Sequence, residues 1–492
     1  MTRTQVQTND FLEKESIGKL MRKFTVPCII SLLVAALYNI VDQIFIANAN
    51  YLGSYGNAAN TVVYPLTVVA LAIAVTFGDG TAAFFSLCLG AKENDSARRS
   101  VGSSVISVIT IGVILAAVYL IFQQPILSMF GAGVNEETFR LSKEYFFWIS
   151  LGIPVYMLGQ TLTPIISSDG SPKYSMCAML VGTAINIILD PIFIYVFEWG
   201  MMGAAVATII GQAACCLIAV GYLFRMKAVK LGPDDMRVRW EMLKRVLPLG
   251  MTSFFAQVSI VLSMAAVLNM VKKYGQMDVI FAQEQYAHIP TAVIGIVMKF
   301  FQIIISIAIG LSAGSIPITG YNMGARRNDR VKELMKRLII AEVIVGAVAL
   351  FVFELFPNQL IGIFGAANES VYYTDFAVAC IRIFLSMIIL ACVNKGTSIF
   401  LQGLGKATQA TSVSVLREIL FGVGLPILLP VFFGLDGILY FMPVADILTF
   451  IVTAIFIAKT NAELSSPAPE ITLTQNQTRL ERASSHQSSV DT

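Results

Sequence analysis

The chain has 492 residues, of which 34 are basic and 31 acidic, and 56% are hydrophobic against only 13% charged. Soluble domains carry about 25% charged residues, so this composition excludes an ordinary soluble globular protein. The net charge of +3 is too small to indicate nucleic-acid binding, and two histidines argue against a histidine-built metal or catalytic centre. The sequence predicts an all-α polytopic membrane protein.

Twelve apolar runs are long enough to cross a bilayer, because a helix needs about 20 apolar residues to span the hydrocarbon core. In chain order they are residues 24–47, 60–84, 101–122, 145–166, 175–197, 202–224, 247–271, 285–312, 337–356, 376–400, 411–432 and 438–458.

These runs divide the chain into five parts. We expect an N-terminal arm at 1–23, a first lobe of six helices at 24–224, a linker at 225–245, a second lobe of six helices at 246–460 and a tail at 461–492. The tail is rich in Ser, Thr, Gln and Pro, cannot bury a core and is predicted to be disordered.

The Lys and Arg residues predict the orientation of the chain. An even number of spans places both termini on one side, and 26 of the 34 basic residues fall on that side against four on the other. Cytoplasmic loops carry the excess of positive charge in membrane proteins. We therefore expect both termini to be cytoplasmic, in a multi-pass protein of the cell membrane.

Short motifs recur at a constant offset and indicate an internal repeat. Residues 90–95 recur at 324–329, residues 130–132 at 364–366 and Gly203 at Gly437, each 234 positions later. Because each half has six spans, the two halves insert in the same direction and are related by a pseudo-twofold axis along the membrane normal. Two such bundles facing each other suggest a central cavity that opens to either side.

The sequence carries no phosphate-binding loop, HExxH, GxSxG or kinase motif. The seven cysteines lie in or beside apolar stretches without a CxxC pair and are interpreted as small apolar residues. We expect no enzyme, no nucleotide and no cofactor. A gradient of H⁺ or Na⁺ is then the expected source of energy for transport.

Ionisable groups inside spans are costly and usually functional, and two of them lie at similar depth. Asp42 of the first span and Asp190 of the fifth both reach the outer third of the bilayer, at about 1.5 Å per residue. Asn186 lies one turn before Asp190, and Thr208 lies near the outer end of span 6. These four residues are predicted to form a coupling site, since their oxygens suit a hard monovalent cation and equally a shared proton. The alternative is that they are hydrogen-bonded clamps between helices.

The second half does not repeat this chemistry, because Asp42 aligns with Ser263 and Asp190 with Leu425. Asp446 in span 12 is a secondary candidate, either for ion handling or for interhelical bonding. The other candidates for cavity-lining or secondary roles are Asn39, Gln257 and Lys299. Lys299 lies near the middle of span 8, where a long side chain cannot easily reach the membrane surface.

Three further features have structural or functional interpretations. Lys395 and Glu418 are predicted to form an ion pair near the inner ends of their spans, and Arg417 and Glu342 another. Pro27 lies fifteen residues before Asp42 in span 1 and is interpreted either as a hinge or as a proline near the helix start.

Taken together, the pattern resembles the MATE (multidrug and toxic compound extrusion) family. The resemblance covers residues 15–460 and rests on twelve spans in two like halves and on a set of ordered motifs. These are Pro27…Asp42, Asn186-x3-Asp190-Pro191, the Gly-Ala-Lys/Arg turn after spans 2 and 8, and Gly203-Ala-Ala-x-Ala-Thr208. It implies drug/cation antiport by a V-shaped pair of bundles, with the cation site at the four residues above and bending of span 1.

Gln257 departs from one branch of that family. The NorM-like branch has an acidic residue at this position, so the resemblance does not imply a sodium site in the second lobe. The chain is more similar to the DinF-like branch, which includes MepA-like bacterial exporters.

The leading hypothesis is thus a monomeric transporter in the lipid bilayer that expels cationic amphipathic drugs in exchange for H⁺ or Na⁺. The runner-up is a lipid-linked precursor flippase of the same superfamily. A membrane-embedded enzyme would need a clustered nucleophile, metal or base, and the sequence presents none.

Overall fold

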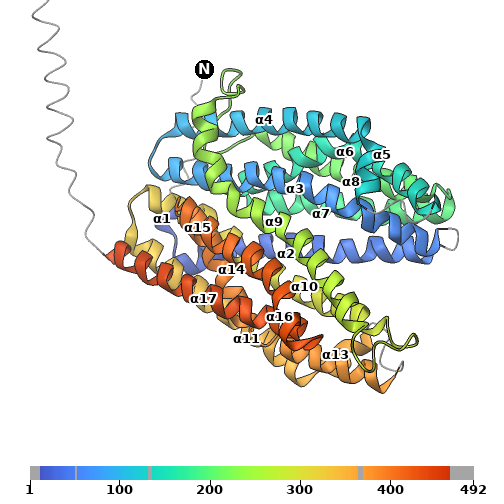
Figure 1. Ribbon diagram of the computed structural model, residues 1–492. Coiled ribbons are helices and arrows are strands. Elements are labelled where there is room, and N and C mark those ends of the chain that lie inside the picture. The colour runs from blue at the N-terminus through green and yellow to red at the C-terminus, as the bar shows by residue number, and fades with distance from the viewer. Residues whose placement is uncertain (1–10, 50–51, 131–135, 364–369, 466–492) are drawn as a thin grey trace, which may run out of the picture.

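The computed structural model describes residues 11–49, 52–130, 136–363 and 370–465, and its regular elements over these ranges are all helical (Figure 1). The chain forms two helical bundles, as predicted. Their helices lie close together at the end where α1 and α15 are labelled and diverge toward α5 and α13 (Figure 1). We call the converging end, which also holds Ser465, the terminal end.

The first bundle contains the N-terminal half of the chain. Its elements are α1 (Phe11–Lys14), α2 (Ile17–Asn48), α3 (Gly53–Gly90), α4 (Asn94–Ile121), α5 (Gln123–Met129), α6 (Glu136–Ser168), α7 (Pro172–Pro191), the π-helix η2 (Ile192–Val196) and α8 (Gly200–Leu223).

The second bundle contains the C-terminal half. Its elements are α9 (Trp240–Gly275), α10 (Ile289–Gly324), α11 (Asn328–Leu355), α12 (Pro357–Ile363), α13 (Val371–Phe384), α14 (Ile388–Gly403), α15 (Ala407–Ser414), the π-helix η3 (Val415–Phe421), α16 (Gly422–Phe433) and α17 (Asp436–Ser465).

The predicted count of twelve spans is confirmed. Within the described ranges, eleven helical stretches are long and apolar enough to cross a membrane, and α13 and α14 supply a twelfth that is bent by 44°. Several helices extend beyond the predicted runs. The first begins at Ile17, inside the expected arm, and the last reaches Ser465, beyond the expected start of the tail at 461. Apolar content marks the hydrocarbon core, whereas the backbone hydrogen bonds continue into polar residues on either side.

The internal repeat is visible in the helices themselves. The helices α4 and α11 each have 28 residues, and α5 and α12 each have seven, at the 234-residue offset of the sequence motifs. The turns before α4 and α11 match as well, because Lys92 and Arg326 both adopt a positive φ, at 63° and 57°.

The two bundles contact each other through helices that have glycine residues at their crossing points. A Cβ atom on Gly250 of α9 would collide with the carbonyl of Thr76 in α3, and one on Gly80 would collide with the carbonyl of Val246. A Cβ on Gly314 of α10 would come within 2.6 Å of the Cα of Thr25 in α2. These glycines allow close backbone approach at the terminal end.

The segment before α2 fastens the two bundles together at the same end. The Leu12 carbonyl accepts hydrogen bonds from Asn322 Nδ2 at 3.2 Å and Arg330 Nη2 at 3.1 Å, and Arg330 Nη2 also donates to the Glu15 carbonyl at 2.6 Å. Leu12 is 1% exposed. Residues 11–17 of the first half are therefore docked on α10 and α11 of the second half.

Candidate functional site

The four residues of the predicted coupling site come together from α2, α7 and α8. The Asn186 amide donates to Asp190 Oδ1 at 3.2 Å and to Thr208 Oγ1 at 3.3 Å. Asp42 and Asp190 lie within side-chain hydrogen-bonding reach of each other. The hydroxyl of Tyr38, one turn before Asp42, lies 3.4 Å from Thr208 Oγ1. We call Asp42, Asn186, Asp190 and Thr208 the first-bundle cluster.

Small residues and a tyrosine set the positions of these side chains. Gly182 and Gly211 face each other, and a Cβ on Gly211 would lie only 3.0 Å from the Asn186 Cβ, so that α7 and α8 pack closely beside Asn186. The Tyr195 hydroxyl of η2 donates to the Phe45 carbonyl of α2 at 2.7 Å. This bond connects the segment that follows Asp190 to the turn that follows Asp42.

The cluster is buried and retains unused hydrogen-bonding capacity. The exposed fractions are 8% for Asp42, 3% for Asn186, 1% for Asp190 and 8% for Thr208. Asp42 Oδ1, Asn186 Oδ1 and Asp190 Oδ2 have no hydrogen-bond partner among the described residues. Buried polar atoms are normally paired, so three unpaired oxygens in one cluster indicate a site that can accept a ligand.

The cluster suits a proton or a hard monovalent cation better than a transition metal. Its oxygens come from carboxyl, amide and hydroxyl groups, which are hard ligands. No group of three or more His, Cys, Asp or Glu residues that could hold a metal ion occurs in the described part of the chain. Two buried carboxyls in contact can bind a single proton between them, because like charges disfavour ionisation of both.

The remaining first-half candidates are Pro27 and Asn39. Pro27 is buried within α2, well after its start at Ile17, and the Ser31 hydroxyl donates to its carbonyl at 2.9 Å. A proline inside a helix leaves one carbonyl without its usual donor and permits a bend. The Asn39 side chain lies outside the described residues.

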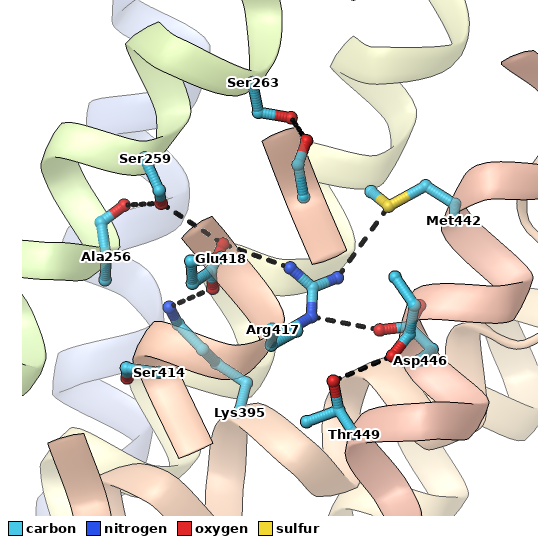
Figure 2. Close-up of polar contacts among 12 residues, drawn as sticks. Ala256, Ser259, Ser263, Lys395, Ser414, Arg417, Glu418, Met442, Asp446 and Thr449 are labelled. Carbon is cyan, nitrogen blue, oxygen red and sulfur yellow. Dashed lines mark hydrogen bonds and ion pairs between the residues drawn. The ribbon is translucent and has the colours of Figure 1, made fainter. Parts of the chain in front are cut away.

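The second bundle holds a network of paired charges instead of an equivalent cluster (Figure 2). Lys395 Nζ lies 2.9 Å from Glu418 Oε1, which confirms that predicted pair. Arg417 contacts Glu418 Oε2 at 3.2 Å and Asp446 Oδ1 at 3.0 Å. The predicted pair of Arg417 with Glu342 is therefore wrong. Arg417 lies in η3, and its guanidinium is directed toward Asp446 of α17 and Glu418.

Asp446, the secondary candidate, is thus engaged in an ion pair between helices. Its backbone carbonyl also accepts from the Asn394 amide at 2.9 Å. Gln257 on α9 and Lys299 on α10 are both half-buried in the second bundle, and their role in a cavity stays a prediction.

Asp79 is a half-buried carboxylate between the bundles that was not among the residues predicted from the sequence. It lies on α3, and its Oδ2 accepts a 2.6 Å hydrogen bond from Ser253 Oγ on α9, across the contact between the bundles. Gln402 Nε2 of α14 donates to the Leu249 carbonyl at 2.8 Å beside it. The signal was present, since Asp79 is an ionisable residue inside the predicted span 60–84.

Comparison with known proteins places this architecture in context. Residues 27–192 and 253–428 match the MatE family. The chain is 25% identical over 440 residues to the multidrug export protein MepA of Staphylococcus aureus strain MSSA476, covering 89% of this chain and 92% of that protein. It is 27% identical over 442 residues to the MepA of Staphylococcus saprophyticus, with the same coverage.

A solved structure has the same fold. It is described as the outward-facing conformation of a multidrug resistance MATE family transporter of the MOP superfamily, and it superposes with a TM-score of 0.84 at 22% identity. The match covers 94% of this chain and 100% of that one.

Proposed function

Because the chain belongs to the MatE family of multidrug efflux transporters, we propose that it expels cationic amphipathic compounds in exchange for H⁺ or Na⁺. The observation that carries the coupling proposal is the buried contact between Asp42 and Asp190, with three unpaired oxygens around it. The MepA relatives, which are named as multidrug export proteins, support export of small-molecule drugs. No cofactor enters this proposal.

The coupling ion acts through the charge of the first-bundle cluster. An ionised carboxyl can only accept hydrogen bonds, so a bond between two carboxyls requires a proton on one of them. Loss of that proton leaves two like charges in contact, which strongly favours either separation of α2 from α7 or entry of a cation. Bound ion and bound cationic drug are therefore alternatives, which is the basis of antiport.

We propose that bending of α2 at Pro27 carries this change. Pro27 weakens the helix between the arm and Asp42, so that the outer part of α2 can move while its start stays against α10. The contacts between the bundles at the terminal end then break and re-form as the transporter alternates its access.

We propose that this terminal end faces the cytoplasm and that the protein works as a monomer in the cell membrane. The positive-inside distribution of the sequence supports this orientation. The apolar side chains that the helices expose, such as Ile121, Leu217 and Phe351 at 72%, 72% and 62%, support the location in a membrane. These surfaces suit the lipid bilayer as their solvent.

The test is export of ethidium from proteoliposomes under an imposed pH or sodium gradient. An elementary charge moved through 100 mV is worth about 2.3 kcal/mol, so a variant without ion exchange should lose more than about tenfold in gradient-driven export. We expect this loss in the Asp42→Asn, Asp190→Asn double variant, because Asn preserves shape but fixes the charge.

Asp95→Asn is the matched control, since Asp95 is an exposed partner of Arg98. It should export ethidium like the wild type. Full gradient-driven export by the double variant would show that both carboxyls are structural clamps and that coupling occurs elsewhere.

A further inference from the structure

A small cavity inside the second bundle has two polar side chains in an otherwise apolar lining. It lies between α11, α14 and α17 and has a volume of about 10 Å³. That is about the space that one water molecule requires. The two polar side chains are Glu342 of α11 and Thr397 of α14, which are 1% and 5% exposed.

Both side chains have unused hydrogen-bonding capacity. Ser312 Oγ of α10 donates to Glu342 Oε1 at 2.7 Å, whereas Glu342 Oε2 and Thr397 Oγ1 have no partner among the described residues. Gly396 of α14 makes room for the carboxyl, because a Cβ there would lie 2.9 Å from Glu342 Oε1. The helices therefore leave room for the Glu342 carboxyl group, but Ser312 satisfies only one of its two oxygens.

No basic side chain in the described part of the chain forms an ion pair with Glu342. Lys395 and Arg417, the bases of the nearby network, are paired with Glu418 and Asp446. Glu342 acts electrostatically on Cys392 of α14, and so do Asp446 and Arg417.

Glu342 also lies within the predicted span 337–356, five residues or about 7.5 Å along the helix from its inner end. An isolated ionised carboxyl at such depth costs several kcal/mol unless a cation or a proton neutralises it. Ionisable groups that are kept inside membranes at this cost are functional candidates.

We propose that Glu342 is a second proton-binding residue of this transporter, with Ser312 and Thr397 as its hydrogen-bond partners; this inference rests on the cation-coupled antiport proposed above. In the protonated state, Oε2–H donates to Thr397 Oγ1 directly or through a water molecule in the cavity. After release of the proton, the Thr397 hydroxyl reverses its role and donates to the carboxylate.

The bound species is a proton and not Na⁺, because too few oxygens are available. Among the described side chains that line the cavity, only Glu342 Oε2 and Thr397 Oγ1 are oxygen atoms without a partner. Hard cations gather about six oxygen ligands in proteins. A proton needs only the carboxyl and one acceptor.

The experiment measures protons released when saturating ethidium is added to the full-length protein in weakly buffered detergent with a pH-indicator dye. Glu342→Gln keeps the acceptor for Ser312 but cannot release a proton, and should lower the release by about half if one proton comes from each bundle. Glu333→Gln is the matched control on the same helix, since Glu333 is half-exposed and pairs with Arg337; it should match the wild type. Thr397→Val, which keeps the carboxyl and removes its partner, should shift the pH of half-maximal release.

The outcomes separate this inference from the proposed function. If the Asp42→Asn, Asp190→Asn variant still releases the fraction of protons assigned to Glu342, the second proton site is supported independently of the first-bundle cluster. Equal release by Glu342→Gln and wild type overturns the Glu342 site while leaving antiport intact. The Glu342 site is also refuted if the wild-type protein releases no proton on addition of ethidium. It is refuted as well if Glu342→Gln changes only the dependence of export on sodium. Absence of ethidium export under either gradient refutes the proposed function itself.

Discussion

Asp169 shows how a carboxyl group outside the membrane-spanning segments joins two parts of the chain. It lies in the turn between α6 and α7 and accepts hydrogen bonds from the backbone N–H groups of Lys227 at 2.6 Å and Ala228 at 3.0 Å. The Tyr222 hydroxyl donates to it at 2.8 Å. Burial raises the pKa of Asp169 from 3.8 to about 6, although these donors act in the opposite direction.

The raised pKa of Asp169 predicts that its contribution to the free energy of unfolding depends on pH. Because the folded-state pKa lies above the unfolded value, the fold favours the protonated form, and the contribution of Asp169 falls as pH rises from about 4 to about 6. At about 1.4 kcal/mol per pH unit the change is roughly 3 kcal/mol. The free energy of unfolding of the wild type minus that of Asp169→Asn should therefore decrease over this range, as measured by denaturation in detergent. A difference that is constant with pH would contradict the assignment, and Asp95→Asn provides the exposed control.

Which polar residues are buried within the spans was easier to predict than which of them pair. Asp42 and Asp190 were found because ionisable residues are rare inside apolar runs and because helical rise gives their depth. Asp190 and Asn186 are four residues apart on one helix, so their contact follows from periodicity. Arg417 was assigned the wrong partner, since the choice between Glu342 and Asp446 depends on the rotation of three helices that are distant in sequence. Hydropathy carries no information on that rotation.

At the level of elements, the crossing of α3 and α9 is the tightest contact between the bundles. Gly250→Val would place side-chain atoms against the Thr76 carbonyl and force the two helices apart. Overpacking of this kind costs about 1–3 kcal/mol, so we expect a lower thermal unfolding midpoint in detergent. The native Cys28, which lies within electrostatic reach of Asp79 near this crossing, should react faster with a maleimide.

Gly424→Ala is the control for that prediction, because no heavy atom lies within 4 Å of a Cβ at this position. The reacted cysteine can be identified by mass spectrometry of the labelled peptide. An unchanged midpoint and unchanged Cys28 reactivity in Gly250→Val would mean that the bundles do not meet at this crossing.

Helix existence was predictable at this scale and helix shape was not. All twelve apolar runs correspond to helical spans because a membrane leaves the backbone no other way to satisfy its hydrogen bonds. The bend between α13 and α14 and the two π-helices fall within predicted spans, where hydropathy does not mark them. Such local departures depend on packing partners, among them the Arg417 network in η3, which become known only with the fold.

For the whole molecule, the charge distribution predicts how the protein is inserted. A cysteine at Asp234, in the linker at the terminal end, should react with a membrane-impermeant reagent only after the cytoplasmic side is opened. A cysteine at Val279, which is 89% exposed between α9 and α10, should react in intact cells. The unsubstituted protein measures the background from its seven native cysteines. Reaction of Asp234→Cys from outside would reverse the orientation, and with it the direction of the proposed export.

The docking of residues 11–17 on α10 and α11 has a consequence for how the molecule is made. Leu12 leaves the ribosome 318 residues before Arg330, which at 5–20 residues per second is an interval of roughly 16 to 60 s. The six spans of the first half are synthesised during this interval, before the groups that will hold their N-terminal segment exist. The docking of the N-terminal segment on the second bundle is thus a late event of biosynthesis. In a nascent chain released before α11 is made, Leu12 and its neighbours would stay exposed, and quality-control proteases could recognise such an incomplete chain by this exposed segment.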